Sequence, residues 1–378
     1  MADHSLHDLL RQSFPKSNKE DWSSAASKEI LGKNAFEILT WKTKDEIKFF
    51  PYYDRQDSKN LGYLKNFEVP PSPNHHTGAR AWQSLPKITV TDVEKANVIA
   101  LSHLGNGADG LLFDLCKFNV VDVNVLLHKI DWPYCNVSFL VTPSTKIIPH
   151  LIVYAQKKKY NPTLLAGTLF WESPPQDTMT SIQAFSSFNK FHSLGLYINP
   201  SSPVKEISEA LTKAANLMEV LTDKGVEKEI AWRNISLSFA AGVDFFLEIA
   251  KLKALRFLWY QLAHAFEIRN YRHTNVQIHV RSESWINEKF QPHSNLLKNT
   301  STALAAVMGG CDALTVAAED ENNNMMNRIA RNVSNILREE AHMDKVSDPV
   351  AGSYAIENMV HKIAQAAWID FQHNMKQS

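Results

Sequence analysis

Four charged residues stand at or just after the ends of runs that predict β-strands, which makes them the first candidates for chemistry. They are Asp114, Glu172, Arg281 and Glu283. Two carboxylates at a suitable separation can share the roles of general acid and general base. No fixed short spacing joins two carboxylates of this chain into such a pair, so the four residues are candidates by position alone.

Common catalytic and metal-binding patterns do not occur in the sequence. There is no H-E-x-x-H, G-x-S-x-G or G-x-x-x-x-G-K-[ST] pattern, and the three cysteines form no C-x-x-C pair. His279 shares one face of a predicted strand with Gln277 and Arg281, and His192 opens the run His-Ser-Leu-Gly. Neither histidine has metal-ligand spacing, so we expect no metal site.

The elements that must position these residues alternate from about residue 80 onward. Strands are predicted at 81–85, 110–115, 136–141, 165–171, 193–198, 235–239, 276–281 and 313–318. Helices are predicted near 91–104, 121–129, 145–158, 176–188, 203–223, 243–265, 295–308, 325–341 and 355–374. Eight strands each followed by a helix predict a (β/α)8 TIM barrel, in which reactive residues lie at the carboxyl ends of the strands.

A doubly wound open sheet is the alternative arrangement of the same elements. That fold usually carries G-x-G-x-x-G after its first strand. Gly105-Asn106-Gly107 lacks the third glycine and precedes the second strand, so we interpret it as a turn that ends a helix.

The helix predicted at 243–265 has the longest apolar stripe in the chain. Asp244 stands where it can cap the first turn. Glu248, Lys251, Lys253 and Arg256 interrupt the stripe too often for a bilayer, where a central charge costs about 2.5–3.5 kcal/mol. We therefore expect a helix that is covered by other parts of the protein.

Composition and organisation exclude several classes of partner. Lys plus Arg and Asp plus Glu each total 40, so no overall field attracts nucleic acid or an anionic membrane. The first twenty residues lack the apolar run of a signal peptide, and we expect a cytoplasmic protein. We divide the chain into an N-terminal arm at 1–76, with short helices at 6–14 and 24–31, and a barrel with a C-terminal helix at 77–378. The arm carries Trp22 and Trp41 and packs either on its own barrel or on a partner subunit.

Four ordered motifs over about 110 residues resemble the methylmalonyl-CoA mutase family. The first is Phe245-Phe246-Leu247-Glu248-Ile249-Ala250-Lys251; the others are Ala303 to Gly310, Arg328 to Asn332, and Glu339-Glu340 with Asp348 to Tyr354. The resemblance implies a (β/α)8 barrel, a dimer with N-terminal arms, and adenosylcobalamin-dependent interconversion of methylmalonyl-CoA and succinyl-CoA.

The departures from the family are equally specific. Family enzymes hold cobalamin on a C-terminal domain that opens with Asp-x-His-x-x-Gly, and we expect no such domain in this chain. The near match at His192 has Lys190 where the aspartate is needed. In active family members a Tyr-His pair follows the fifth strand, and its His donates to the thioester carbonyl. The corresponding positions of this chain are about Leu194 and Gly195. Other site segments are rewritten at 82–86, 169–175 and 280–285, and we expect a barrel axis filled by large apolar side chains.

This pattern resembles the non-catalytic small subunit of heterodimeric members of the family. We therefore expect no catalytic, cofactor-binding or metal-binding residue in this chain, with adenosylcobalamin held by a large catalytic subunit as its partner. A homodimer is possible when the chain is isolated. The alternative is a catalytic acyl-CoA mutase barrel whose cobalamin domain is a separate chain. A third hypothesis is an unrelated barrel enzyme that uses Asp114, Glu172 or Arg281.

Overall fold

The computed structural model describes most of the chain, namely residues 18–57, 64, 78–173, 175, 177–269, 271–272, 275–283, 293–321 and 323–377. The helix predicted at 6–14 and the end of the rewritten segment at 280–285 lie outside these residues.

Nine parallel strands form one sheet in the order β3-β11-β10-β9-β8-β7-β6-β5-β4. They are β3 (Gln83–Ser84), β4 (Lys87–Thr89), β5 (Gly110–Asp114), β6 (Asn136–Val141), β7 (Ala166–Trp171), β8 (Lys190–Tyr197), β9 (Ile235–Ala240), β10 (Ile278–Arg281) and β11 (Ala313–Thr315). β3 pairs with β11 and β4 pairs with β5, while only Leu85 and Pro86 separate β3 from β4. The two short strands are therefore the halves of one barrel strand, and the predicted (β/α)8 barrel is confirmed.

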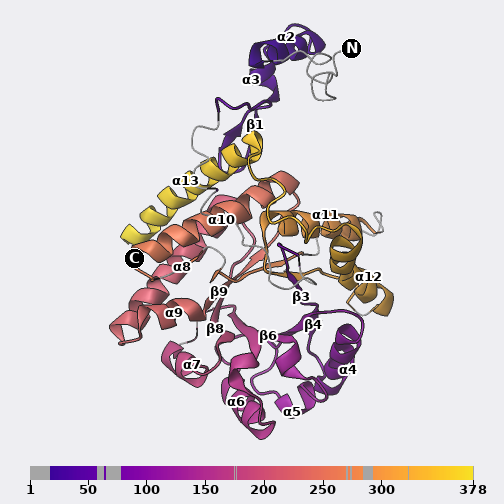
Figure 1. Ribbon diagram of the computed structural model, residues 1–378, viewed down its shortest axis with the longest axis vertical. Coiled ribbons are helices and arrows are strands. Elements are labelled where there is room, and N and C mark those ends of the chain that lie inside the picture. The colour runs from indigo at the N-terminus through magenta and orange to yellow at the C-terminus, as the bar shows by residue number, and fades with distance from the viewer. Residues whose placement is uncertain are drawn as a thin grey trace, which may run out of the picture.

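Helices surround the strands in the expected alternation (Figure 1). They are α4 (Val93–Leu104), α5 (Val123–Leu126), α6 (Ile148–Lys157), α7 (Thr178–Ala184), α8 (Pro203–Asp223), α9 (Lys228–Asn234), α10 (Phe245–Ala265), α11 (Ser294–Gly309), α12 (Asn324–Asn335) and α13 (Tyr354–Gln377). A π-helical turn, η5 (Ile336–Glu340), continues α12. The sequence did not predict α9, because seven residues are too short to show a helical period.

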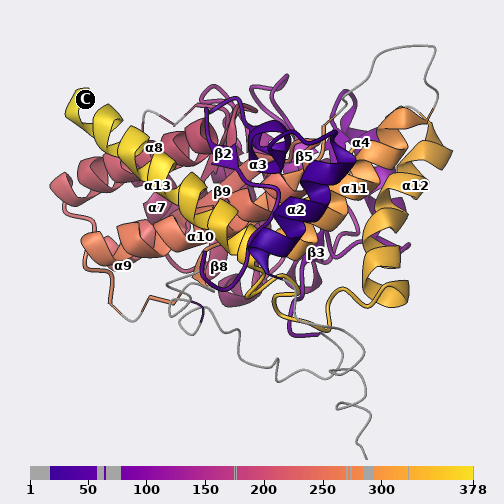
Figure 2. The ribbon, with the colours of Figure 1, turned by 90° about the horizontal axis from the view of Figure 1, so that it is seen from above.

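Helix α10 is covered by α8, α11 and α13, and Figure 2 shows α13 lying across it. Its charged side chains are ion-paired within the protein. Lys251 Nζ lies 2.8 Å from Glu206 Oε2 and 2.6 Å from Glu248 Oε2, and Lys253 Nζ lies 2.9 Å from both Asp348 and Glu357. Buried charges require such partners. The motifs at Ala303–Gly310, on α11, and at Asp348 thus contact α10.

Two expectations about helices need correction. Asp244 is the N-cap residue of α10, but its side chain makes no capping hydrogen bond. The helix expected at 24–31 runs instead over α2 (Lys19–Glu29), because Asn18 and Asp21 form a capping box that starts it earlier. Within the described residues, no helix combines the length and the apolar run that crossing a bilayer requires.

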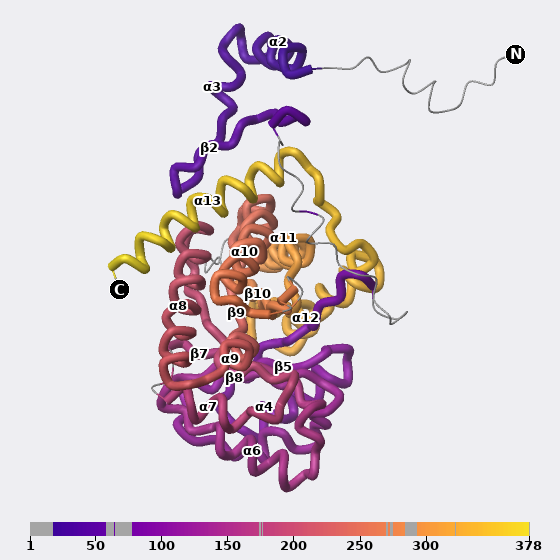
Figure 3. The backbone as a smooth tube through the Cα atoms, turned by 60° about the vertical axis from the view of Figure 1, so that its left-hand side comes forward, coloured from indigo at the N-terminus to yellow at the C-terminus, as the bar shows by residue number. Residues whose placement is uncertain are grey.

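Residues 18–57 form an arm outside the barrel, built from α2, α3 (Ala35–Leu39) and a hairpin of β1 (Trp41–Lys42) and β2 (Lys48–Phe49). The hairpin rests on α13, where Lys362 Nζ donates to the Lys48 carbonyl at 2.7 Å. Helices α2 and α3 stand beyond α13, away from the barrel (Figures 1 and 3). Part of the arm therefore packs on its own domain, and part projects from it.

Candidate functional site

A cavity of about 280 Å³ opens at the carboxyl ends of the barrel strands. Its lining includes Lys87 after the break in the first strand, Tyr197 at the end of β8, and Arg281 at the end of β10. Helices α4 and α12 add His103 and Arg331. This is the end of a (β/α)8 barrel at which reactive side chains normally gather.

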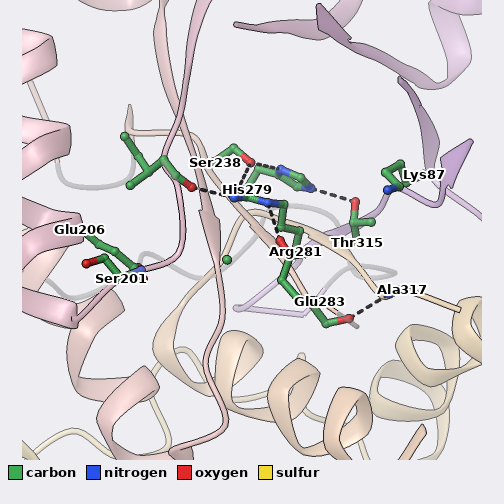
Figure 4. Close-up of polar contacts among 12 residues, drawn as sticks. Lys87, Ser201, Glu206, Ser238, His279, Arg281, Glu283, Thr315 and Ala317 are labelled. Atoms are coloured by element: carbon green, nitrogen blue, oxygen red, sulfur yellow. Dashed lines mark hydrogen bonds and ion pairs between the residues drawn. The ribbon is translucent and has the colours of Figure 1, made fainter. Parts of the chain in front are cut away.

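A directed chain of hydrogen bonds crosses the barrel below this cavity (Figure 4). Thr315 Oγ1 donates to the Leu85 carbonyl at 2.5 Å, so it accepts from His279 Nε2 at 2.8 Å. His279 Nδ1 then accepts from Ser238 Oγ at 2.8 Å, and Ser238 accepts from Arg281 Nη1 at 3.1 Å. Burial, and then the charge of Arg281, lowers the pKa of His279 to about 3. His279 is therefore neutral, and both of its nitrogens are engaged.

Each nitrogen of the Arg281 guanidinium donates to a group of the protein. Its Nη2 donates to the Ile198 carbonyl at 2.6 Å, and its Nε donates to Glu283 Oε1 at 3.0 Å. The guanidinium carbon also lies 3.7 Å from the centroid of the Tyr197 ring, a close cation–π contact. Arg281 and Glu283, two of the four candidates, are thus brought together as an ion pair.

Asp114 and Glu172, the other two candidates, meet at the thiol of Cys116. The backbone N–H of Cys116 donates to Asp114 Oδ1 at 3.2 Å. Burial raises the pKa of the Cys116 thiol, and the nearby Asp114 and Glu172 carboxylates raise it further. The thiol is therefore protonated rather than a nucleophile. Neither carboxylate lines the mouth cavity, so the four candidates form two separate pairs rather than one constellation.

The barrel axis is closed between the mouth and the opposite end. The Phe170 ring stacks on His279 with centroids 5.1 Å apart, and Leu112 and Leu140 pack against Phe170. A second cavity of about 930 Å³ lies at the amino ends of the strands and shares no lining residue with the mouth cavity. The expectation of an axis filled by large apolar side chains holds for this cluster but not for its hydrogen-bonded half, where polar residues from β9, β10 and β11 fill the space.

Leu194 and Gly195 lie on opposite faces of β8. Leu194 lies in the core between the barrel and the surrounding helices. Gly195 faces Phe170, and a Cβ built on it would lie 2.6 Å from Thr168 Cγ2 and 2.7 Å from Phe170 Cδ1. Real Cβ atoms essentially never come so close, so this inner position accepts no side chain without displacement of its neighbours.

His192 lies at the amino end of β8, where it lines the second cavity. Its Nδ1 is 2.8 Å from the carbonyl oxygen of Arg233, and burial lowers its pKa. The residue is therefore at the end of the barrel opposite the mouth. Among the described residues, no group of three or more His, Cys, Asp or Glu side chains could hold a metal ion.

Sequence reasoning did not single out Lys87, Tyr197 and Arg331, which line the mouth cavity. Lys87 was overlooked because Pro86 seemed to end the first strand; although burial opposes its charge, the Glu321 carboxylate raises its pKa. Tyr197 was hidden inside a predicted strand, and burial raises its pKa. Arg331 was noticed only as part of a family motif. The alternation of strand residues could have found Tyr197, but nothing local marks the other two.

Comparisons with known proteins agree with the fold. The family model described as "Methylmalonyl-CoA mutase" matches residues 184–376, which is about half of the chain. "Methylmalonyl-CoA mutase small subunit" of Porphyromonas gingivalis is 28% identical over 95% of this chain and 63% of its own length. The protein of the same name from Streptomyces virginiae is 26% identical over 96% of this chain and 64% of its own length.

Relatives named simply "Methylmalonyl-CoA mutase" also align. The protein from Rhizobium meliloti is 24% identical over 92% of this chain and 57% of its own length. The chain thus spans 57% to 64% of the length of these three relatives.

Proposed function

The chain belongs to the methylmalonyl-CoA mutase family, and from this premise we propose that it is the non-catalytic small subunit of a two-chain mutase. In this proposal the large partner subunit carries out the adenosylcobalamin-dependent isomerisation of methylmalonyl-CoA and succinyl-CoA. The names of the relatives from P. gingivalis and S. virginiae support the small-subunit role.

The observation that carries the proposal is the closed barrel axis. A slender acyl thioester could reach a buried centre through a barrel only if the axis were open. Here Phe170 and His279 occupy the axis, and the hydrogen bonds of His279 to Ser238 and Thr315 hold its ring in place. Among the described residues the two end cavities share no lining residue, which argues against a continuous channel along the axis for such a substrate.

The two positions of β8 at which the family's Tyr-His pair falls also lack a group that could act on a thioester. Gly195 has no side chain, and Leu194 faces the outer core. His279, the nearest imidazole on the axis, gives its Nε2 proton to Thr315 and accepts a proton from Ser238. Neither nitrogen can donate to a carbonyl without breaking a buried hydrogen bond, which typically costs about 1–3 kcal/mol.

The described residues do not fit adenosylcobalamin. The segment nearest to the cobalt-ligand pattern has Lys190 in place of the aspartate that would orient the histidine. Its His192 lies at the amino end of the strands and is hydrogen-bonded to the Arg233 carbonyl. We therefore assign the cofactor to the partner subunit.

The projecting arm offers a surface for that partner. Trp22 stacks on Tyr52 with centroids 5.4 Å apart, so the arm has a small aromatic core of its own. Outside this core Leu31 is 91% exposed and Ile38 is 50% exposed. Apolar side chains on a projecting element are typical of subunit interfaces. A homodimer through the same arms, and a cytoplasmic location, remain parts of the proposal.

A turnover assay tests the proposal against its alternative, a catalytic barrel served by a cobalamin domain on another chain. The isolated chain is supplied with methylmalonyl-CoA, adenosylcobalamin and a free cobalamin domain. A parallel assay contains the full large subunit in place of the free domain. We expect turnover only when the large subunit is present, and Glu172→Gln or Asp114→Asn in this chain should leave kcat of the complex unchanged. Turnover by the isolated chain with the free domain would establish the alternative.

A further inference from the structure

Arg331 is a buried guanidinium without a carboxylate partner among the described residues. It lies on α12, lines the mouth cavity and is only 8% exposed. Its Nη1 is 3.3 Å from Nδ1 of His103, and its Nε has no hydrogen-bond partner. A buried charge that is neither paired nor fully hydrogen-bonded is unfavourable, so a protein that retains one normally supplies it with a counter-charge.

His103 does not supply that counter-charge. Burial, and then the charge of Arg331, lowers the pKa of His103 to about 4, so its imidazole is neutral near pH 7. A neutral imidazole that accepts from Arg331 at Nδ1 carries its proton on Nε2. His103 therefore contributes one hydrogen-bond acceptor to Arg331 but no negative charge.

The carboxylates that line the same cavity contact groups other than Arg331. Glu283 pairs with Arg281 at 3.0 Å, and Glu321 lies 3.3 Å from Lys87 Nζ and accepts from Thr89 at 2.8 Å. Glu319 accepts from the backbone N–H of His293 at 2.9 Å and lies 3.1 Å from its Nδ1. The described lining carries three cationic side chains and three carboxylates, and Arg331 is the cationic one that no carboxylate contacts.

We propose that the cavity binds a compact oxyanion, a small carboxylate or a phosphate, through Arg331. A guanidinium presents a fork of N–H donors that matches two oxygens of either group, and the unpartnered Nε is part of that fork. The volume of about 280 Å³ is enough for several water molecules, so it admits a small acid. This site is independent of the proposed function, because it requires neither turnover nor a partner subunit.

Calorimetric titration of the full chain with acetate, malonate and inorganic phosphate tests the proposal, with neutral malonamide as the blank. We expect saturable binding of at least one oxyanion below about 20 mM and none of malonamide. Arg331→Gln should weaken that binding at least about ten-fold, since charge-assisted hydrogen bonds are lost. Arg328→Gln is the matched control, because it removes an exposed arginine from the same helix, and it should leave the affinity within about two-fold.

The oxyanion that binds with the lowest Kd, whether acetate, malonate or phosphate, is the one that the site prefers. Ala330→Leu provides a second variant, because Ala330 lines the cavity beside Arg331 and the larger side chain fills the space without removing the charge. It should also abolish binding, and it decides the matter if Arg331→Gln does not fold. Absence of saturable binding by all three oxyanions, or unchanged affinity in either variant, would overturn the proposal.

Discussion

Phe170 and His279 stack across the barrel axis, with ring centroids 5.1 Å apart and planes inclined by 30°. Phe170 comes from β7, and His279 comes from β10 on the far side of the ring of strands. Hydrogen bonds to Ser238 and Thr315 fix the orientation of the imidazole, so the Phe170 ring packs against a ring that cannot rotate freely. This contact separates the two end cavities and is the structural basis of the non-catalytic proposal.

Phe170→Ala should both destabilise the chain and open its axis. Removal of a buried aromatic ring costs about 3–5 kcal/mol of the free energy of unfolding. Phe239→Ala is the matched control, because Phe239 is equally buried but lies in the outer core. Urea unfolding should show similar losses for both variants, whereas only Phe170→Ala should gain binding of pantetheine. Equal pantetheine binding by the two variants would show that Phe170 does not close the axis.

Gly195→Ala should destabilise the barrel through overcrowding. The new Cβ would lie within 2.8 Å of Thr168, Leu169 and Phe170 atoms, and such overpacking typically costs about 1–3 kcal/mol. Phe170→Leu in the same chain should recover part of this loss, which a double-mutant cycle on urea unfolding would measure. Strict additivity of the two substitutions would contradict the contact.

Acid should destabilise the protein through His279. The folded pKa is about 3, whereas an unfolded histidine titrates near 6.5, so below about pH 6.5 the unfolded chain binds a proton that the folded chain does not. Stability is therefore lost as the pH falls, by about 2 kcal/mol between about pH 6.5 and 5 for this residue alone. Urea unfolding at several pH values should show a flatter dependence for His279→Gln.

The control for acid sensitivity is His128→Gln, which replaces an exposed histidine. It should keep the wild-type dependence on pH. His103, with a pKa of about 4, adds a second contribution of the same sign. An unchanged dependence in His279→Gln would mean that the ring does not remain neutral in the folded protein.

Substitutions on the arm should prevent assembly without unfolding the barrel. The double variant Leu31→Asp, Ile38→Asp places charges on side chains that are already exposed, so the melting temperature of the isolated chain should change little. Association with the large subunit should be lost. Deletion of residues 1–60 should also abolish this association. Val153→Asp on α6 is the control, since Val153 is 60% exposed and lies away from the arm (Figure 1). Normal gel-filtration assembly of the double variant would refute the assignment of this surface.

Much of the fold was predictable because buried parallel strands and their covering helices leave strong local patterns. Runs rich in Val, Phe and Leu such as Asn136–Val141, all six residues of which are buried, mark strands covered on both faces. Pro86 concealed the second half of the first strand, since proline lacks the N–H that a ladder requires, yet the neighbouring strands still pair on either side of it.

The site was less predictable because its character depends on contacts between distant segments. Arg281 was a candidate by position. Its hydrogen-bond acceptors, Glu283, Ser238 and the Ile198 carbonyl, come from three separate segments of the chain. The same holds for Arg331, because only the packing of α12 against α4 shows that, among the described residues, its neighbour is His103 rather than a carboxylate. Sequence spacing carries no information about such pairings.

The central claim is that this barrel binds no acyl-CoA substrate, and the stoichiometry of substrate binding tests it most directly. Equilibrium dialysis of the purified two-chain complex with labelled methylmalonyl-CoA, under conditions that prevent turnover, counts the occupied barrels. The closed axis at Phe170 and His279 predicts one ester per pair of chains. Two esters per pair, or tight binding by the isolated small chain, would contradict the account.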